Sequence, residues 1–264
     1  MSVTANARPA QAAAYQVPAV EKALDILEHL AERPDGAGMT ELAQALGRSM
    51  GEIYRTVIAL ERREFLVKDP ATDRYHLSLR LFELAHRHPP VARLVRLAQP
   101  ILDDLAAVTL QSCHLAVADG HRLLILATAE SPLPMHYSVK VGAAFPLMET
   151  SSGAVIVAGA RPERREAVLA ALPPAERAEA EARCAAAARA GHEVIESRVV
   201  RGVTNLSAPV RDHAGIVIAA LTIPYLEQSR AEASRAAALA RLVGAAARLS
   251  ASLGYRHAPQ EIDP

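Results

Sequence analysis

The segment Ser49–Phe65, SMGEIYRTVIALERREF, carries the side chains of this chain that are best suited to binding a polyanion. Its apolar residues Ile53, Val57 and Leu60 recur at helical spacing and predict one buried helix face. The opposite face carries the polar side chains Tyr54, Arg55, Arg62 and Arg63. A helix fits the major groove of duplex DNA, where guanidinium groups bind phosphates and guanine edges. Taken alone, the segment is an ordinary amphipathic helix with a solvated basic face, so its neighbours decide the interpretation.

A capping box marks the start of this helix. Ser49 stands at the N-cap and Glu52 follows three residues later, so the hydroxyl can accept one unpaired backbone N–H and the carboxylate can reach back to another. Glu52 would repel phosphate, and if it reads a base it would prefer N4 of cytosine. The capping box therefore fixes the start of the helix, while the DNA sequence that the helix would recognise stays open.

Two further helices are predicted before it. Pro18–Arg33 has an apolar stripe at helical spacing, and Pro34 with the residues after it ends that helix. Thr40 is predicted to cap a short helix, Glu41–Leu46, which Gly47 ends in the left-handed conformation. Because the next helix begins almost at once, the two must cross steeply, which is the helix-turn-helix geometry.

A β-hairpin is predicted directly after the third helix. Phe65–Lys68 and Arg74–Leu77 read as short strands around a polar loop that contains Pro70. Such a hairpin forms the wing of a winged helix-turn-helix, and Lys68 and Arg74 flank it where they could contact phosphate. The hairpin could also serve to cover the helical core.

Composition limits the possible functions. The 264 residues include 29 basic and 29 acidic side chains, so any basic surface must be local. Cys113 and Cys184 show neither metal-ligand spacing nor a disulfide framework, which favours a reducing cytoplasm. No apolar run approaches the roughly 20 residues that cross a bilayer. The amino-terminal residues lack the pattern of a secretory signal and are expected to form a flexible arm.

Beyond the wing, strands and helices alternate and predict an α+β domain with a mostly antiparallel sheet flanked by helices. Asp119-Gly120 is a strong hairpin signal between strands Cys113–Ala118 and His121–Ala127. Pro100 predicts a kink or break in the helix Val91–Val108. The other expected strands are Met135–Val141, His192–Arg198, Leu206–Val210 and Val217–Ile223, and the other expected helices are Val155–Ala160, Pro162–Leu172, Pro174–Ala190 and Ser229–Leu253. The resulting segments are an arm at 1–17, a winged helix-turn-helix domain at 18–77, a linking helix at 78–90, the α+β domain at 91–256 and a tail at 257–264.

Sequence motifs of common enzyme classes are absent. There is no G-x-S-x-G, P-loop, H-E-x-x-H or Rossmann glycine set, and we expect no catalytic residue, metal or cofactor. The alternative hypothesis is a small-molecule enzyme on the α+β domain, with the first domain a protein-interaction module. The charge layout of the first domain discriminates between the two. Convergence of its arginines and Lys68 on one face favours DNA, whereas dispersal among Glu52, Glu61, Glu64 and Asp73 favours the interaction module.

The ordered set of motifs resembles the IclR family of bacterial transcription regulators. In the first domain the resemblance is carried by Ala23–Leu27, Glu41–Ala43, Arg55, Leu60-Glu61 and Arg74–Leu77. In the second it is carried by Gly142–Leu147, Ser151–Gly153, Gly202-Val203, Ala208–Val210 and Ala219–Ile223. It covers nearly the whole chain and implies a ligand-responsive regulator with a GAF-like effector-binding domain.

The resemblance implies how such a protein would bind DNA. Because one small domain reads only a few base pairs, a dimer on a roughly palindromic operator is expected, and the family adds a dimer of dimers, a tetramer. The expected DNA contacts are Arg48, Ser49, Glu52, Tyr54, Arg55, Arg62, Lys68 and Arg74.

The resemblance also implies an effector pocket at Thr150-Ser151-Ser152-Gly153. A helix start offers unpaired N–H groups and a positive dipole end that suit a carboxylate, although the run could be a plain N-cap. Where the family commonly has a lysine after this glycine, the chain has Ala154. Arg198, near the pocket by the same resemblance, would favour an anionic effector, and the expected class is an organic acid or aromatic metabolite. The other expected pocket residues are Asn205, Ser207 and Thr222.

Overall fold

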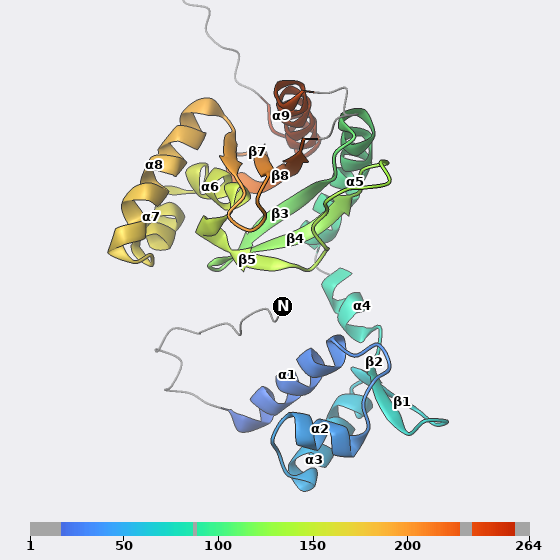
Figure 1. The fold of residues 1–264 in the computed structure, drawn as a ribbon. Coiled ribbons are helices and arrows are strands. Elements are labelled where there is room, and N and C mark those ends of the chain that lie inside the picture. Colours follow the sequence, from blue (N-terminus) through green and yellow to red (C-terminus); the bar gives the residue numbers. More distant parts are fainter. Residues whose placement is uncertain (1–16, 87–88, 228–233, 257–264) are drawn as a thin grey trace, which may run out of the picture. The chain divides into compact units, whose positions relative to one another are not determined.

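The computed structural model describes residues 17–86, 89–227 and 234–256 of the chain. It divides the chain into two compact units, Met1–Pro89 and Pro90–Pro264, each with its own elements (Figure 1). The expected arm and tail lie outside the described residues, apart from Val17 at the end of the arm.

The first unit is a winged helix-turn-helix, as predicted. Its elements are α1 (Pro18–Ala31), α2 (Met39–Ala45), α3 (Met50–Arg62), β1 (Leu66–Asp69), β2 (Arg74–Leu77) and α4 (Arg80–His86). Ile26 of α1, Leu42 of α2 and Ile53 of α3 are completely buried and form the centre of its core. β1 and β2 pair antiparallel to form the wing, and the buried Tyr75 of β2 packs against the same core, so the wing also covers the helices.

The helix caps differ in detail from the expectation. The second helix begins two residues earlier than expected, at Met39, and Glu41 Oε2 accepts a hydrogen bond from the backbone N–H of Gly38 at 3.1 Å. Gly38 is therefore the N-cap, and the prediction that Thr40 caps this helix was wrong. At α3 the capping residue is Ser49, as predicted, and its backbone N–H donates to Glu52 Oε2 at 3.1 Å. The Ser49 hydroxyl donates to the same carboxylate oxygen at 2.9 Å.

The second unit is built on one antiparallel sheet. The sheet order is β5-β4-β3-β8-β7-β6, and every described neighbouring pair runs antiparallel. The strands are β3 (Cys113–Asp119), β4 (Arg122–Ala129), β5 (Ala144–Pro146), β6 (Glu193–Glu196), β7 (Val203–Arg211) and β8 (Val217–Leu226). The predicted hairpin at Asp119-Gly120 is confirmed by the β3–β4 pairing.

Helices cover both faces of this sheet (Figure 1). One face packs against α5 (Pro89–Thr109) and α9 (Arg235–Ser252), in a core that includes Leu102, Leu221 and Leu242. The other face packs against α6 (Ser151–Ala158), with α7 (Pro162–Ala170) and α8 (Pro174–Ala190) around it. Alternation along each strand separates the two faces, so Cys113 and Leu115 belong to the first core and Ala116 to the second.

Three expectations for this unit need correction. Met135–Val141 is irregular rather than a strand, because backbone hydrogen bonds to β4 begin only at Gly142 and Ala143 and the edge strand is β5. α5 runs through Pro100 as one helix, so no break occurs there. α6 begins at Ser151, four residues before the predicted start, because the polar run is itself the first helical turn. The predicted start of the last helix, residues 229–233, lies outside the described residues.

Gly153 allows α6 to approach the preceding segment closely. A Cβ built on Gly153 would lie 1.7 Å from the carbonyl oxygen of Leu147 and 2.9 Å from Thr150 Oγ1. The first turn of α6 and the 3₁₀ helix Leu147–Glu149 therefore share a space that admits no side chain at this position.

We predict that Gly153→Ala destabilises the second unit by at least about 2 kcal/mol, because the contact is with backbone that must move. Gly244→Ala is the matched control, since Gly244 lies within α9 and a Cβ there would have nothing within 4 Å. That variant should gain about 0.5–1 kcal/mol from helix propensity. Denaturant unfolding of the full chain, followed by far-UV circular dichroism, measures both. Equal stability of the two variants would contradict the close approach at Gly153.

Candidate functional site

The exposed face of α3 and its C-cap carry three arginines, Arg55 and Arg62 in the helix and Arg63 at the cap. Arg55 and Arg62 are seven residues apart and therefore lie on one line of the helix, opposite the buried positions of the same helix. None of the three has an acidic partner among the described residues. Tyr54, which is 56% exposed, lies beside them. This face therefore presents free guanidinium groups and an aromatic side chain to solvent.

The other expected basic contacts of this unit have acidic partners. Arg48 lies 3.8 Å from Asp25, and Lys68 pairs with Asp73. The hydrogen bond with Asp73 raises the pKa of Lys68. The remaining member of the expected set, Glu52, holds the α3 cap and lies 3.6 Å from Lys22 Nζ. The hydrogen bond from the Ser49 hydroxyl is the main cause of the lowered pKa of Glu52.

Arg74, which was expected to contact phosphate, is paired within the first unit. Its guanidinium donates to both carboxylate oxygens of Glu41, at 3.1 and 2.7 Å, which is the main cause of the lowered pKa of Glu41. It also donates to the carbonyl oxygens of Asp35 and Gly36, at 2.9 and 3.0 Å. Arg74 thus ties the wing to the start of α2. The basic side chains of this unit therefore fall into two groups. The arginines on the exposed side of α3 are free of ion pairs within the described part of the chain, whereas Arg48, Lys68 and Arg74 are paired with acidic side chains.

The second candidate site is a cavity of about 60 Å³ beside the first turn of α6. Five of the expected pocket residues lie in its wall, namely Thr150, Ser151, Ser152, Asn205 and Thr222. The other two, Gly153 and Ser207, are not part of the wall. Gly153 is needed for the close approach described above, and Ser207 is completely buried behind the wall. The rest of the wall consists of His114, Leu123, Ile125, Tyr137, Val139, Phe145, Ser197, Val199 and Pro224.

Four hydroxyl groups form a continuous chain behind and along this wall. Ser151 Oγ lies 2.7 Å from Ser207 Oγ, Ser207 Oγ lies 2.7 Å from Thr222 Oγ1, and Thr222 Oγ1 lies 2.7 Å from Ser152 Oγ. Each hydroxyl carries one proton, so three hydrogen bonds leave one proton without an acceptor in the chain. The chain therefore holds α6 to β7 and β8 and retains one donor.

The first backbone N–H groups of α6 are also only partly paired. Thr150 caps the helix, since its hydroxyl accepts from the N–H of Gly153 at 3.0 Å and donates to the Leu147 carbonyl oxygen at 2.9 Å. The N–H of Ala154 donates to the Thr150 carbonyl oxygen. The N–H groups of Ser151 and Ser152 have no acceptor among the described residues. Two N–H donors and one hydroxyl proton are thus available at a helix N-terminus, where the dipole favours an acceptor with negative charge.

A buried ion pair supports this helix start from behind. Arg183 of α8 and Glu193 of β6 form two hydrogen bonds at 2.9 Å, and each side chain is about one-tenth exposed. Arg183 also donates to the carbonyl oxygens of Met148 and Thr150, at 2.6 and 3.1 Å. The pair therefore fixes the segment that leads into α6. Sequence reasoning missed Arg183, because nothing in an alanine-rich helix distinguishes it from its solvated neighbours.

Sequence reasoning also missed His114 of β3. The alternation of buried residues along β3 could have placed it on the same sheet face as α6. Arg198 was expected near the pocket, and Ser197 and Val199 on either side of it belong to the cavity wall. Arg198 lies outside the cavity wall, is half exposed and pairs with Glu179. Nearby Glu196 accepts a hydrogen bond from the Thr204 hydroxyl at 2.8 Å.

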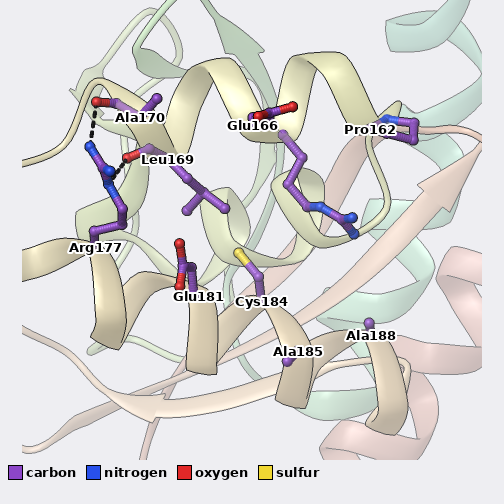
Figure 2. A pocket seen from close by; sticks show the side chains of 10 residues that line it. Pro162, Glu166, Leu169, Ala170, Arg177, Glu181, Cys184, Ala185 and Ala188 are labelled. Carbon is purple, nitrogen blue, oxygen red and sulfur yellow. Dashed lines mark hydrogen bonds between the residues drawn. The ribbon is translucent and has the colours of Figure 1, made fainter.

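A larger surface groove lies between α7 and α8, with a volume of about 640 Å³ (Figure 2). Cys184 lies at its base, and burial raises the pKa of this thiol to about 11. Arg177 at its edge donates to the carbonyl oxygens of Leu169 and Ala170, at 3.0 and 2.7 Å. This groove is larger than the cavity, and Arg177 at its edge is already paired with backbone carbonyl groups. Among the described residues there is no group of three or more potential metal ligands, and no described helix could span a membrane.

Comparison with known proteins identifies the family of the chain. Residues 90–251 match the family model described as the bacterial transcriptional regulator IclR C-terminal domain, and residues 19–70 match the IclR helix-turn-helix domain. The chain belongs to the IclR family of bacterial transcriptional regulators. It is thus an IclR-type DNA-binding regulator with a C-terminal ligand-binding domain.

Individual IclR relatives resemble the chain over nearly its full length. The transcriptional regulator KdgR of Escherichia coli is 26% identical over 254 residues, covering 92% of this chain and 95% of KdgR. HmgR of Pseudomonas aeruginosa, a solved structure, is 27% identical with a TM-score of 0.69 and covers 90% of this chain and 100% of HmgR. An IclR homologue from Microbacterium hydrocarbonoxydans, solved with 4-hydroxybenzoate, has a TM-score of 0.75 at 22% identity, covering 89% of this chain and 98% of that one.

We predict that Arg183→Met lowers the free energy of unfolding of the second unit by roughly 3–5 kcal/mol, because it leaves Glu193 buried without its partner. The double variant Arg183→Met/Glu193→Gln should lose less than the sum of the two single changes. Arg198→Met is the control, since its exposed pair with Glu179 should contribute at most about 1 kcal/mol. Urea unfolding measures all four variants, and additive losses would contradict the coupling of the pair.

Proposed function

We propose that the protein regulates transcription by placing α3 in the major groove of an operator, under control of a small organic acid bound at the start of α6. The observation that carries the DNA-binding part is the exposed, unpaired line of Arg55 and Arg62 on α3. A helix of this diameter fits the major groove, and arginine suits both phosphate and guanine. In this arrangement the wing lies beside the recognition helix and brings Lys68 near the groove. Arg74, through Glu41, and Glu52, through the α3 cap, stabilise the first unit itself.

The operator is read by paired first units. The exposed side chains Val17, at the N-cap of α1, and Val20 and Leu24 within it follow one stripe, and Leu79 just before α4 and Leu84 within it are also exposed. Exposed apolar stripes at helical spacing are typical of surfaces that pair with another helix. We propose a second copy of this chain as the partner, so that two recognition helices meet half-sites about one helical turn apart or a multiple of it. Assembly of two such dimers into a tetramer belongs to the same proposal.

The effector is proposed to place a carboxylate or carbonyl oxygen on the free N–H groups of Ser151 and Ser152. The relative solved with 4-hydroxybenzoate shows that an IclR homologue holds an acid. The cavity here, at about 60 Å³, is smaller than the engineered cavity of about 150 Å³ that holds benzene. A compact organic acid therefore fits better than one with an aromatic ring. Asn205, which also lines the cavity, can donate to or accept from the rest of the ligand.

Ligand binding would act on DNA affinity through differential affinity for two arrangements of the assembled protein. A ligand that binds one arrangement more tightly shifts the population toward it, and the spacing of paired first units then changes. Because the coupling is reciprocal, operator DNA must change the affinity for the effector by the same factor.

We predict that Arg55→Ala and Arg62→Ala each weaken binding to DNA from the region upstream of the protein's own gene without unfolding the first unit. Each should also reduce the slope of log affinity against log salt by about 1, because one phosphate contact is lost. Arg161→Ala, an exposed arginine at the start of α7, is the control and should change neither quantity. Fluorescence anisotropy at several salt concentrations measures the slopes. Wild-type affinity in both α3 variants would remove this face from the DNA interface.

A further inference from the structure

The cavity contains one polar side chain that the protein leaves without a partner. His114 lies on β3, directly opposite Thr222 of β8 in the antiparallel register, and it lines the cavity. It is 6% exposed, and its Nδ1 is buried without a hydrogen-bond partner among the described residues. Buried polar atoms in folded proteins almost always have a partner. An unpaired nitrogen in a cavity wall therefore marks a position where a ligand group belongs.

The neighbouring groups do not satisfy this nitrogen. Thr222, the closest polar neighbour across the strands, already bonds Ser152 and Ser207 at 2.7 Å each. Much of the remaining wall is apolar, formed by residues such as Leu123, Ile125 and Phe145. No side chain with a full charge contributes to the wall. No described residue pairs with this nitrogen, so the His114 ring has unused hydrogen-bonding capacity beside the cavity.

The chemistry of the imidazole limits what this molecule can offer. Burial lowers the pKa of His114 to about 4, so the ring is neutral at physiological pH. A neutral imidazole has one N–H donor and one bare nitrogen acceptor. A hydroxyl group can pair with either nitrogen, because it both donates and accepts. A second carboxylate would lose its hydration without gaining a positive partner, which is unfavourable in a wall of this kind.

We infer that His114 determines specificity by selecting effectors that carry a hydroxyl group in addition to their carboxylate. The carboxylate lies at the start of α6 and the hydroxyl pairs with the His114 ring, so the preferred class is the hydroxy monocarboxylic acids. Plain monocarboxylic acids and dicarboxylic acids are discriminated against. This inference rests on the proposed effector site at α6 and adds to it the second polar contact.

The test compares matched acids that differ by one hydroxyl, using the full-length protein and isothermal titration calorimetry. The pairs are lactate and propionate, 3-hydroxybutyrate and butyrate, and 4-hydroxybenzoate and benzoate, which place the hydroxyl at increasing distances from the carboxylate. For at least one pair, the wild type should bind the hydroxylated acid at least about tenfold more tightly, because a site built to bond a hydroxyl rejects an analogue without one.

His114→Leu should reduce that ratio to near 1 while leaving the affinity for the plain acid within about threefold, since one hydrogen bond is lost and the carboxylate contacts remain. His114→Asn keeps a neutral donor and acceptor and should retain a clear preference for the hydroxylated acid. The melting temperatures of both variants show that they fold. If His114→Leu does not fold, the preference kept by His114→Asn together with its loss in His114→Ala decides the question.

The outcomes separate this inference from the proposed function. Equal binding of both members of every pair by the wild type, or an unchanged ratio in His114→Leu, overturns the role of His114 while the carboxylate site stands. Absence of binding by all six acids overturns both the role of His114 and the carboxylate site. Operator binding, measured on the same preparation, reports separately whether the protein acts as a regulator.

Discussion

The structure of the second unit depends on placing the amino-terminal end of a helix inside a protein core. Residues 151 to 157 of α6 are all buried, although a helix start carries N–H groups that no preceding turn can pair. The protein satisfies this end mostly with neutral groups. Thr150 caps it, the hydroxyls of Ser207 and Thr222 hold its serines, and Gly153 lets the backbone close against Leu147. The buried ion pair of Arg183 with Glu193 holds the carbonyl groups of Met148 and Thr150, which precede this helix.

Both candidate sites consist of groups that the fold leaves unpaired. In the first unit, Arg48, Lys68 and Arg74 are engaged by acids of the same unit, and the arginines on the outer face of α3 are not. In the second unit, the hydrogen bonds around α6 account for all but two backbone N–H groups, one hydroxyl proton and a histidine nitrogen. Unpaired exposed arginines suit a polyanion, and unpaired neutral groups in a small cavity suit a compact ligand with few polar atoms.

Much of this organisation could be predicted from the sequence, because it depends on local patterns. The spacing of Ile53, Val57 and Leu60 defined α3, and Asp119-Gly120 defined a hairpin. Features that depend on tertiary contacts were not accessible in the same way. Alternation over Met135–Val141 suggested a strand, yet its side chains at Tyr137 and Val139 line the cavity and its backbone makes no ladder.

The same distinction between local patterns and tertiary contacts applies to the site residues. Motif position placed Ser151, Ser152, Asn205 and Thr222 correctly in the cavity wall. It could not reveal that Arg74 is held by Glu41, thirty-three residues away in sequence, or that Arg198 is turned to Glu179. His114 was missed because no sequence pattern encodes a buried nitrogen that has no partner among the described residues.

A crystal structure of the protein with the best-binding acid from a thermal-shift screen tests the central claim most directly, because the small cavity and the groove between α7 and α8 differ greatly in size. The account predicts the carboxylate within hydrogen-bonding distance of the Ser151 and Ser152 N–H groups, in the small cavity, with the rest of the ligand toward His114. A ligand seated instead in the larger groove between α7 and α8, with the first turn of α6 unoccupied, would contradict it.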